Sequence, residues 1–187
     1  MRTTIGVLTQ EKLKHHLTYF PETGLFVRNP ELIASSKPTN AALKVGYADK
    51  RKRRVMIKIS KKKYVAHQLA FLYMWGFVPS EGIDHINLDR TDNRWVNLRS
   101  ATALQNNRNK GIQKNNTSGY KGVTRSGKKW KATIHLEEGV LYLGTFRSAY
   151  RASQSYDLAA MKYFGEFALT NEVLEKDKAN KFLLSLM

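Results

Sequence analysis

The sequence has no cysteine and four prolines among its 187 residues. Without cysteine the chain can form no disulfide and no zinc site built on thiolates. It also has no run of 18 apolar residues, and its first ten residues lack the apolar stretch of an export signal. These absences exclude a membrane-spanning helix and predict a protein of the cytoplasm that does not bind membranes.

Acidic side chains are also scarce, with 15 Asp and Glu against 32 Lys and Arg and a formal net charge of +17. Such a surplus repels itself unless an anion neutralises it, and nucleic acid is the usual partner of so basic a chain. Residues 1–110 carry 20 basic and 8 acidic side chains (net +12), and residues 111–187 carry 12 and 7 (net +5). Both parts are therefore expected to contact the polyanion.

Local patterns predict short helices and strands in the first part of the chain. Thr9 is placed to cap a helix over residues 10–17, and a turn at 21–24 precedes a strand at 25–28. From Arg54 apolar and polar residues alternate, which predicts a strand with one buried face. The other elements expected there are a loop at 29–45, a basic hairpin tip at 61–63, a helix at 64–76, a turn-rich stretch at 83–99 and a helix from about residue 102.

A small sheet and a helix are predicted in the second part. The expected elements are strands at 120–125, 129–136 and 140–146, a helix at 148–164, and a helical tail at 172–187. Residues 111–119 are rich in Lys, Asn, Gly and Ser, which is typical of a linker between domains.

The middle strand of that sheet alternates cleanly. Trp130, Ala132, Ile134 and Leu136 form one face, and Lys131, Thr133 and His135 form the other. If the first face packs on the helix, the second faces either solvent or a DNA groove. The pattern alone does not choose between these two interpretations.

One constellation has the residue types that phosphodiester hydrolysis requires. Asp84 and His85 are adjacent, Asn97 follows the turn-rich stretch, and Asn106 lies in the next helix. A carboxylate and an amide oxygen can bind a hard divalent cation and leave positions for water and phosphate. A neutral histidine beside the cation can take a proton from the attacking water. An Asp-His pair alone is more often structural, but the whole constellation favours a nuclease site.

The run Asp84-His85-x11-Asn97-x8-Asn106, with residues 64–70 before it, resembles the HNH family, whose ββα-metal core is shared by phage intron-encoded homing endonucleases. The resemblance covers residues 45–110. It implies that Asp84 and Asn106 bind the metal and that His85 is the general base. It also implies that Asn97 holds the His85 loop by hydrogen bonds to backbone. Because the last of these positions is Asn rather than His, the resemblance implies Mg²⁺ or Mn²⁺ rather than zinc.

The other histidines of this part are interpreted as structural. His67 lies in the apolar helix, where a hydrogen-bonded structural role is favoured over a catalytic one. His15 and His16 are adjacent, so they point to different faces of a helix and cannot easily share a metal.

Residues 120–123, Trp130, residues 142–146 and residues 155–160 together resemble the APETALA2-type DNA-binding domain of plant ethylene-response factors. The resemblance covers residues 117–170. The groove contacts that it implies are Lys121, Thr124, Trp130, Thr133, His135 and Tyr142. The plant pattern has Arg, Glu and Arg where this chain has Thr124, Thr133 and His135, so the plant target sequence is not carried over.

The densest basic run is Lys50-Arg51-Lys52-Arg53-Arg54. Such a run fits a nuclear-localisation signal, a solvated loop or a phosphate-binding segment. Beside a nuclease the third hypothesis is favoured, with phosphate contacts by Arg51, Arg53 and Arg54.

The sequence therefore predicts an α+β protein with an N-terminal ββα-metal HNH nuclease domain at 1–110 and a small three-stranded antiparallel sheet packed on one helix at 120–171. Its predicted function is a phage-type homing endonuclease of a bacterial host cell. It would use a divalent cation and no small-molecule cofactor, and would nick one strand of double-stranded DNA. The alternatives are a non-catalytic DNA-binding regulator with a relic nuclease fold and a basic RNA-binding protein. Whether the chain is a monomer or a dimer is left open.

Overall fold

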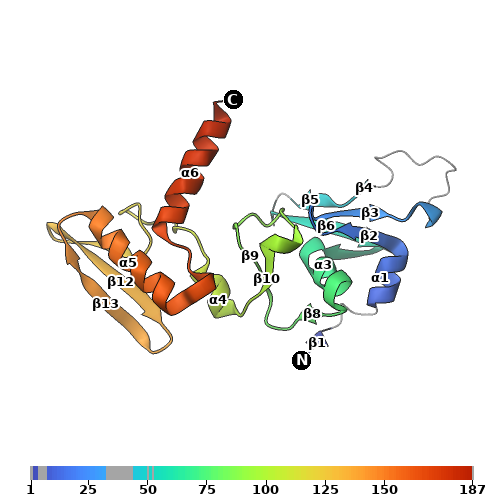
Figure 1. The fold of residues 1–187 in the computed structure, drawn as a ribbon, viewed down its shortest axis with the longest axis horizontal. Helices are drawn as coiled ribbons and strands as arrows, with labels where there is room; N and C mark the ends of the chain where they lie inside the picture. Colours follow the sequence, from blue (N-terminus) through green and yellow to red (C-terminus); the bar gives the residue numbers. More distant parts are fainter. Residues whose placement is uncertain (1, 4–7, 33–43, 50, 52, 187) are drawn as a thin grey trace. The chain divides into compact units, whose positions relative to one another are not determined.

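The computed structural model describes residues 2–3, 8–32, 44–49, 51 and 53–186, and the chain divides into two compact units, Met1–Ala103 and Leu104–Met187. Both units combine short helices with small antiparallel sheets (Figure 1). No helix among the described residues is long and apolar enough to cross a membrane.

The first unit begins with a capped helix and a hairpin. The Thr9 side chain accepts a hydrogen bond of 3.2 Å from the Lys12 backbone N–H and starts α1 (Gln10–His16), as predicted. Strand β2 (Leu17–Phe20) then pairs with the predicted strand β3 (Leu25–Arg28). β2 was not predicted because its alternation lasts four residues and directly follows a helix. The remaining short elements at this point of the chain are η1 (Pro30–Leu32) and β4 (Lys44–Val45), which pairs with β3.

A second three-stranded sheet leads into the apolar helix. Its strands are β5 (Tyr47–Asp49), β6 (Arg54–Ile59) and β7 (Lys62–Val65), and α3 (Ala66–Trp75) follows directly. The helix was predicted to start at residue 64. It starts two residues later because Tyr64 and Val65 pair with β6, and the turn that closes this hairpin lies at Ser60 and Lys61.

Strands β9 (Ile83–His85) and β10 (Leu98–Ser100) form a two-stranded antiparallel ladder around the turn-rich stretch. A short 3₁₀ helix, η2 (Trp95–Asn97), ends that stretch. A further pair, β1 (Arg2–Thr3) with β8 (Val78–Pro79), completes the unit. Helix α3 supplies the centre of the apolar core, whose fully buried large side chains include Leu13, Phe26, Ile57, Leu69 and Phe71.

The second unit is a three-stranded antiparallel sheet on one helix. Its elements are β11 (Val123–Ser126), β12 (Lys129–Leu136), β13 (Gly139–Phe146), α5 (Ala149–Phe164), η3 (Gly165–Phe167) and α6 (Asn171–Ser185). Strand order is β11-β12-β13. Ala132 and Ile134 of β12 are buried together with Ala152, Tyr156 and Ala160 of α5, because small helix side chains allow close approach to the sheet.

Two boundaries differ from the prediction. Helix α4 (Ala103–Arg108), apart from its first residue, and residues 111–119, the expected linker, fall in the second unit. The segment is held there by local hydrogen bonds: Ser118 Oγ donates to the backbone of Tyr120 and Val123, and Asn116 accepts from the Gly119 N–H. A polar, Gly-containing segment looks like a linker in sequence, but here its Asn and Ser side chains satisfy its backbone.

Candidate active site

Asp84 and His85 lie at the end of β9, opposite β10. The antiparallel register pairs Asp84 with Arg99 and His85 with Leu98. Both polar side chains are buried, with 5% and 6% of their surfaces exposed. Burial of a carboxylate and an imidazole side by side requires compensating partners, and each has one.

Arg99 is the partner of Asp84. Its Nε and Nη2 atoms donate hydrogen bonds of 3.0 and 2.8 Å to Oδ2 of the carboxylate. The guanidinium neutralises the buried charge and fixes the orientation of the carboxylate. Replacing either residue alone would leave the other charge buried without its counter-ion.

His85 faces an amide and a second imidazole. Its Nε2 lies 3.5 Å from Oδ1 of Asn93, and its ring meets the ring of His67 edge to face with centroids 5.0 Å apart. Asn93 is itself buried, and its Nδ2 donates a 3.0 Å hydrogen bond to the Thr91 carbonyl. This bond turns Oδ1 of Asn93 toward Nε2 of His85, where it accepts a hydrogen bond if the ring carries its proton on Nε2.

The protonation state of His85 follows from its surroundings. Burial lowers the pKa of His85 below 6.5, and this effect exceeds the opposing influence of Asn93 and Asp84. The ring is therefore neutral at neutral pH. A neutral imidazole held in one tautomer can accept a proton at its unprotonated nitrogen.

Asn97 closes the loop that His85 enters. Its Oδ1 accepts a 2.9 Å hydrogen bond from the Asn87 N–H, and its Nδ2 donates a 2.8 Å bond to the Asp92 carbonyl. One side chain thus joins the two arms of the loop. These bonds agree with a positioning role for Asn97, whose part in catalysis stays a prediction.

The acidic side chains between the two strands hold the turn itself. Asp89 accepts hydrogen bonds from the N–H and hydroxyl of Thr91, and Asp92 accepts bonds from Arg94 and Asn87. The Thr91 hydroxyl lowers the pKa of Asp89, and the Arg94 guanidinium lowers that of Asp92. Both carboxylates therefore serve the loop conformation in this structure.

Asn106, the other predicted metal ligand, lies on α4 in the second unit. The structure therefore brings Asp84, His85 and Asn97 together, and the role of Asn106 stays a prediction. The donor set, one carboxylate and one amide, suits a hard cation such as Mg²⁺ or Mn²⁺. Throughout the described part of the chain no group of three or more His, Cys, Asp or Glu side chains is placed to hold a metal ion.

The basic run lies partly outside the described residues, because Lys50 and Lys52 belong to the undescribed positions. Arg51 and Arg53 are exposed, as phosphate contact requires. Arg54, at the start of β6, is half-buried, and its Nε atom has no hydrogen-bond partner among the described residues. Its charge contributes to lowering the pKa of His67.

The outer face of the second unit's sheet carries several of the predicted DNA contacts. Thr124, His135 and Tyr142 are exposed there, and Thr133 is half-exposed. The Tyr142 hydroxyl lies 2.6 Å from that of Thr145 on the same strand. These positions are accessible to a groove, and their contact with DNA stays a prediction.

Trp130 and Lys121 are placed differently. Trp130 packs with the core beside Ala132 and lies under the guanidinium of Arg125, 4.7 Å from the ring centroid. Nζ of Lys121 donates a 2.5 Å hydrogen bond to the Arg108 carbonyl at the end of α4, and burial lowers the pKa of Lys121 to about 8. In this structure both side chains stabilise the unit.

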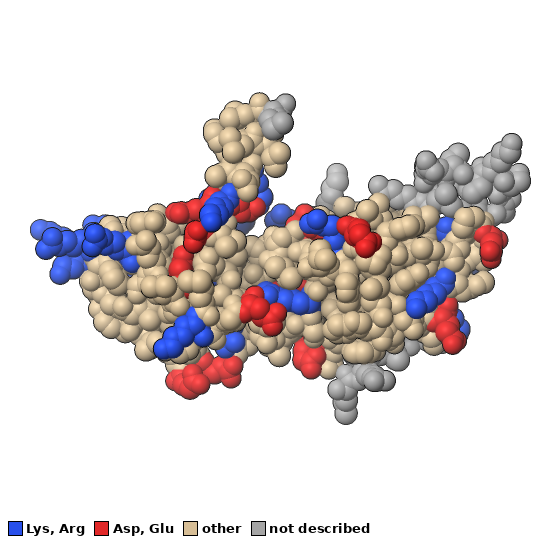
Figure 2. Space-filling model, viewed as in Figure 1, with Lys and Arg blue, Asp and Glu red and all other residues tan. Residues whose placement is uncertain are grey.

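Charge is unevenly distributed over the second unit's sheet. Basic side chains gather at the end where β11 turns into β12, and acidic ones lie near the opposite end (Figure 2). The basic end contains Arg125, Lys128, Lys129 and Lys131, all of them exposed, whereas Glu137 and Glu138 occupy the other turn. A cavity of about 720 Å³ in the same unit is lined by Thr124, Thr133 and His135 together with residues of the 107–117 segment.

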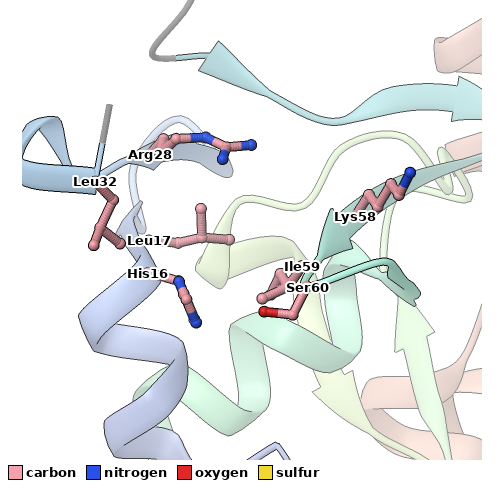
Figure 3. A pocket seen from close by; sticks show the side chains of 7 residues that line it. All are labelled: His16, Leu17, Arg28, Leu32, Lys58, Ile59 and Ser60. Carbon is pink, nitrogen blue, oxygen red and sulfur yellow. The ribbon is translucent and has the colours of Figure 1, made fainter. Parts of the chain in front are cut away.

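A smaller cavity of about 320 Å³ lies in the first unit (Figure 3). His16, Arg28 and Lys58 surround it, and its lining contains no acidic side chain. None of the predicted catalytic or metal-binding residues lines this cavity, so it is not part of the candidate active site.

Sequence patterns missed three side chains that the structure adds to the site. Arg99 could have been found from the strand pairing, since it lies opposite Asp84 in the ladder. Asn93 was visible only as a turn residue. Tyr19 has no local signal, because its hydroxyl reaches the Asn93 carbonyl across 74 positions of sequence.

Comparison with known proteins agrees with this geometry. Residues 64–108 match the HNH endonuclease family. A protein of Acanthamoeba polyphaga mimivirus named as an HNH endonuclease is 34% identical over 105 residues, covering 54% of each chain. The match lies in the middle of the chain, which corrects the expectation of an N-terminal nuclease domain.

Plant transcription factors match as well. An AP2-like ethylene-responsive factor of Arabidopsis thaliana is 33% identical over 112 residues, and one of Oryza sativa subsp. japonica is 39% identical over 70 residues. These alignments cover 57% and 35% of this chain but 20% and 11% of the plant proteins. The chain thus spans about half of the viral relative and a fifth or less of the plant ones. What the family match establishes is an HNH endonuclease domain at residues 64–108, a domain of nuclease enzymes.

Proposed function

We propose that this chain is a metal-dependent endonuclease that hydrolyses phosphodiesters of double-stranded DNA. The observation that carries the proposal is the environment of His85: a buried imidazole of lowered pKa whose Nε2 faces Oδ1 of Asn93, next to the Asp84 carboxylate. A general base for water needs this protonation state, and a fixed orientation makes proton transfer efficient.

In this mechanism each residue of the site has one task. His85 takes a proton from the attacking water at its unprotonated ring nitrogen, and the imidazolium that forms is stabilised by the neighbouring Asp84 charge. Asn97 holds the loop between the strands, so that the imidazole does not move during proton transfer. Asp84 and Asn106 would hold the divalent cation, which when bound stabilises the charge on the leaving oxygen.

The second unit would hold the enzyme on its DNA. Its exposed outer face offers hydroxyl and imidazole groups that can meet base edges, and its basic turn offers charges for phosphates. The AP2-like plant relatives are transcription factors by name, which supports DNA binding by this part. Target-specific cleavage of the homing type is the role proposed for the combination, and one active site per chain makes a nick the expected product.

One observation favours a second candidate, a DNA-binding regulator without catalysis. Arg99 already neutralises the Asp84 carboxylate, and two of its hydrogen bonds end on one oxygen. In a catalytic site the Arg99–Asp84 pair has to leave an oxygen of the carboxylate accessible to a cation. In a nuclease fold that has lost catalysis the same pair is a buried ion pair and has no such requirement.

Cleavage and binding measured together separate these candidates. The purified chain is incubated with supercoiled plasmid carrying the DNA that surrounds its own gene, with Mg²⁺, with Mn²⁺ or with EDTA. Binding to duplex DNA and to structured RNA is measured at the same salt. Open circles that form only with metal support the endonuclease. Tight duplex binding without cleavage under any of these conditions supports the regulator, and preferential binding of RNA contradicts both.

A further inference from the structure

The β2–β3 hairpin reaches the loop that carries Asn93 at three points. The Tyr19 hydroxyl donates a buried 2.7 Å hydrogen bond to the Asn93 carbonyl, and the Trp95 N–H donates a 2.8 Å bond to the Pro21 carbonyl. At the tip of the hairpin a Cβ on Gly24 would lie 2.4 Å from the carbonyl carbon of Asn93 and the nitrogen of Arg94. The hairpin lies outside the 64–108 segment that matches the HNH family.

We propose that Tyr19 is a positioning residue of the nuclease site, which orients His85 through Asn93. This inference rests on the proposed function, because it assigns to the hydroxyl of Tyr19 an effect on the general base. Tyr19 does not touch the reacting atoms.

The hydroxyl of Tyr19 is held in place by its ring. The side chain is 3% exposed, its ring stacks on Phe26 with centroids 4.7 Å apart, and it meets the ring of Tyr73 edge to face at 5.8 Å. Burial raises the pKa of Tyr19 well above its usual value, so the group is a neutral donor throughout the physiological range. A donor fixed in this way defines where the Asn93 carbonyl lies.

Asn93 transmits that position to His85. Its backbone carbonyl accepts from Tyr19, its Nδ2 donates to Thr91, and its Oδ1 faces Nε2 of His85 at 3.5 Å. A contact of 3.5 Å is at the far limit of a hydrogen bond, so a shift of a few tenths of an ångström decides whether it forms. Loss of the Tyr19 bond would therefore change the orientation of the imidazole and the preference for the tautomer protonated on Nε2.

The first test removes the hydroxyl and keeps the ring. Tyr19→Phe is compared with Tyr73→Phe, which makes the same change in the ring that touches Tyr19. The structure records no hydrogen bond for the Tyr73 hydroxyl among the described residues. At saturating DNA and metal, Tyr19→Phe should lower the first-order cleavage rate by about tenfold, a part of the roughly 10²- to 10⁴-fold that general-base catalysis contributes, because His85 is misplaced but still present. The Kd for DNA should stay unchanged, and Tyr73→Phe should cleave within twofold of the wild type.

The second test asks whether Tyr19 acts through Asn93. In a double-mutant cycle, Tyr19→Phe should have less than about a twofold effect once Asn93→Ala has removed the contact with His85. The ring-nitrogen NMR signals of His85, assigned by their loss in His85→Ala, should shift in Tyr19→Phe and stay in place in Tyr73→Phe. The NMR measurement does not depend on cleavage.

The outcomes distinguish this inference from the proposed function. Absence of cleavage by the wild type overturns the nuclease function, and unchanged His85 signals in Tyr19→Phe overturn the positioning role. An equal loss of rate in the wild-type and Asn93→Ala backgrounds also overturns the positioning role, since Tyr19 would then act by another route.

Discussion

Two histidine rings, His67 and His85, lie edge to face in the first unit. Burial, followed by the charge of His85, lowers the pKa of His67 to about 3, and burial also lowers that of His85. Among the described residues no hydrogen-bond partner faces the buried Nδ1 atom of His67, and the structural role expected for this residue stays a prediction. Burial therefore favours the neutral form of both imidazoles.

The low pKa of His67 predicts a pH-dependent stability. In the unfolded chain the residue has a pKa near 6.5, whereas in the folded chain it has a pKa of about 3. Between these values the unfolded state binds the additional proton, so the free energy of unfolding falls as the pH is lowered from 6.5. His67→Gln should remove this contribution and make the fall less steep by about 1 kcal/mol per pH unit.

Urea unfolding at several pH values between 7 and about 5 measures this slope. His15→Gln is the matched control, because His15 is exposed on α1. A slope that is the same in the wild type and in His67→Gln would show that His67 is not the buried neutral group described above.

Site residues that lie close together in the sequence could be predicted from it. Contacts between residues far apart in the sequence could not. Asp84, His85 and Asn97 lie within 14 positions, and the strand–turn–strand that joins them places them together. The hydroxyl of Tyr19 and the amide of Asn93 meet only because two hairpins pack on each other. Such a contact depends on tertiary packing, which local periodicity does not encode.

At the element scale, the β2–β3 hairpin depends on one glycine. Gly24 has φ of +70°. A Cβ at this position would lie 2.4 Å from the carbonyl carbon of residue 93 and from the nitrogen of residue 94. Because backbone cannot move aside as a side chain can, Gly24→Ala should lower the free energy of unfolding by about 3 kcal/mol. It should also slow cleavage, since the same contact positions Asn93.

Gly127 offers a matched control for this substitution. It also has positive φ, +57°, but no atom lies within 4 Å of the position that a Cβ would occupy. Gly127→Ala should therefore show the backbone strain alone, about 1 kcal/mol, in the same urea titration. Equal losses at the two glycines would mean that the hairpin does not press against the 93–94 backbone.

Strands with a long apolar–polar alternation could be predicted from the sequence, whereas the short strands that are defined by their pairing could not. The eight-residue alternation of β12 was predicted with its exact bounds, and so was the order of the sheet and helix around it. β2 and β7 have four residues each, and each is adjacent to a helix. The apolar spacing of so short a strand cannot be told apart from that of the neighbouring helix. Pairing with a neighbouring strand decides such cases, and pairing is a tertiary property.

At the scale of the whole molecule, the net charge of +17 is expected to govern the DNA binding proposed above. The exposed basic turn of the second unit, Lys128 and Lys129, is expected to contact phosphates. Replacing both with Gln should weaken binding equally for all sequences and reduce the slope of log K against log salt by about 2. The cleavage rate at saturating DNA should not change.

Lys176→Gln serves as the control for this measurement, because Lys176 is paired with Glu172 on α6. Affinities between about 50 and 200 mM salt give the slopes. An unchanged slope in the Lys128/Lys129 double variant would place the DNA elsewhere on the chain.

The two compact units of the structure meet between residues 103 and 104, whereas the predicted domains cover residues 1–110 and 120–171. Composition indicated a linker at 111–119, but the Asn and Ser side chains of this segment bond to their own backbone within the second unit. Helix α4 belongs to the same unit, where Arg108 lies over the Phe164 ring and pairs with Glu137. The predicted metal ligand Asn106 is thus carried by a helix that is anchored to the sheet-and-helix unit.

A plasmid-nicking assay shows whether His85 acts as the general base of a metal-dependent nuclease. Wild type, His85→Ala and the exposed control His15→Ala are compared with Mg²⁺, Mn²⁺ or EDTA on plasmid carrying the DNA around the gene. Wild type and His15→Ala should convert supercoiled DNA to open circles with metal, while EDTA abolishes the conversion and His85→Ala slows it by about 100-fold or more. Metal-dependent nicking by His85→Ala at the wild-type rate would contradict the role of His85 as the general base.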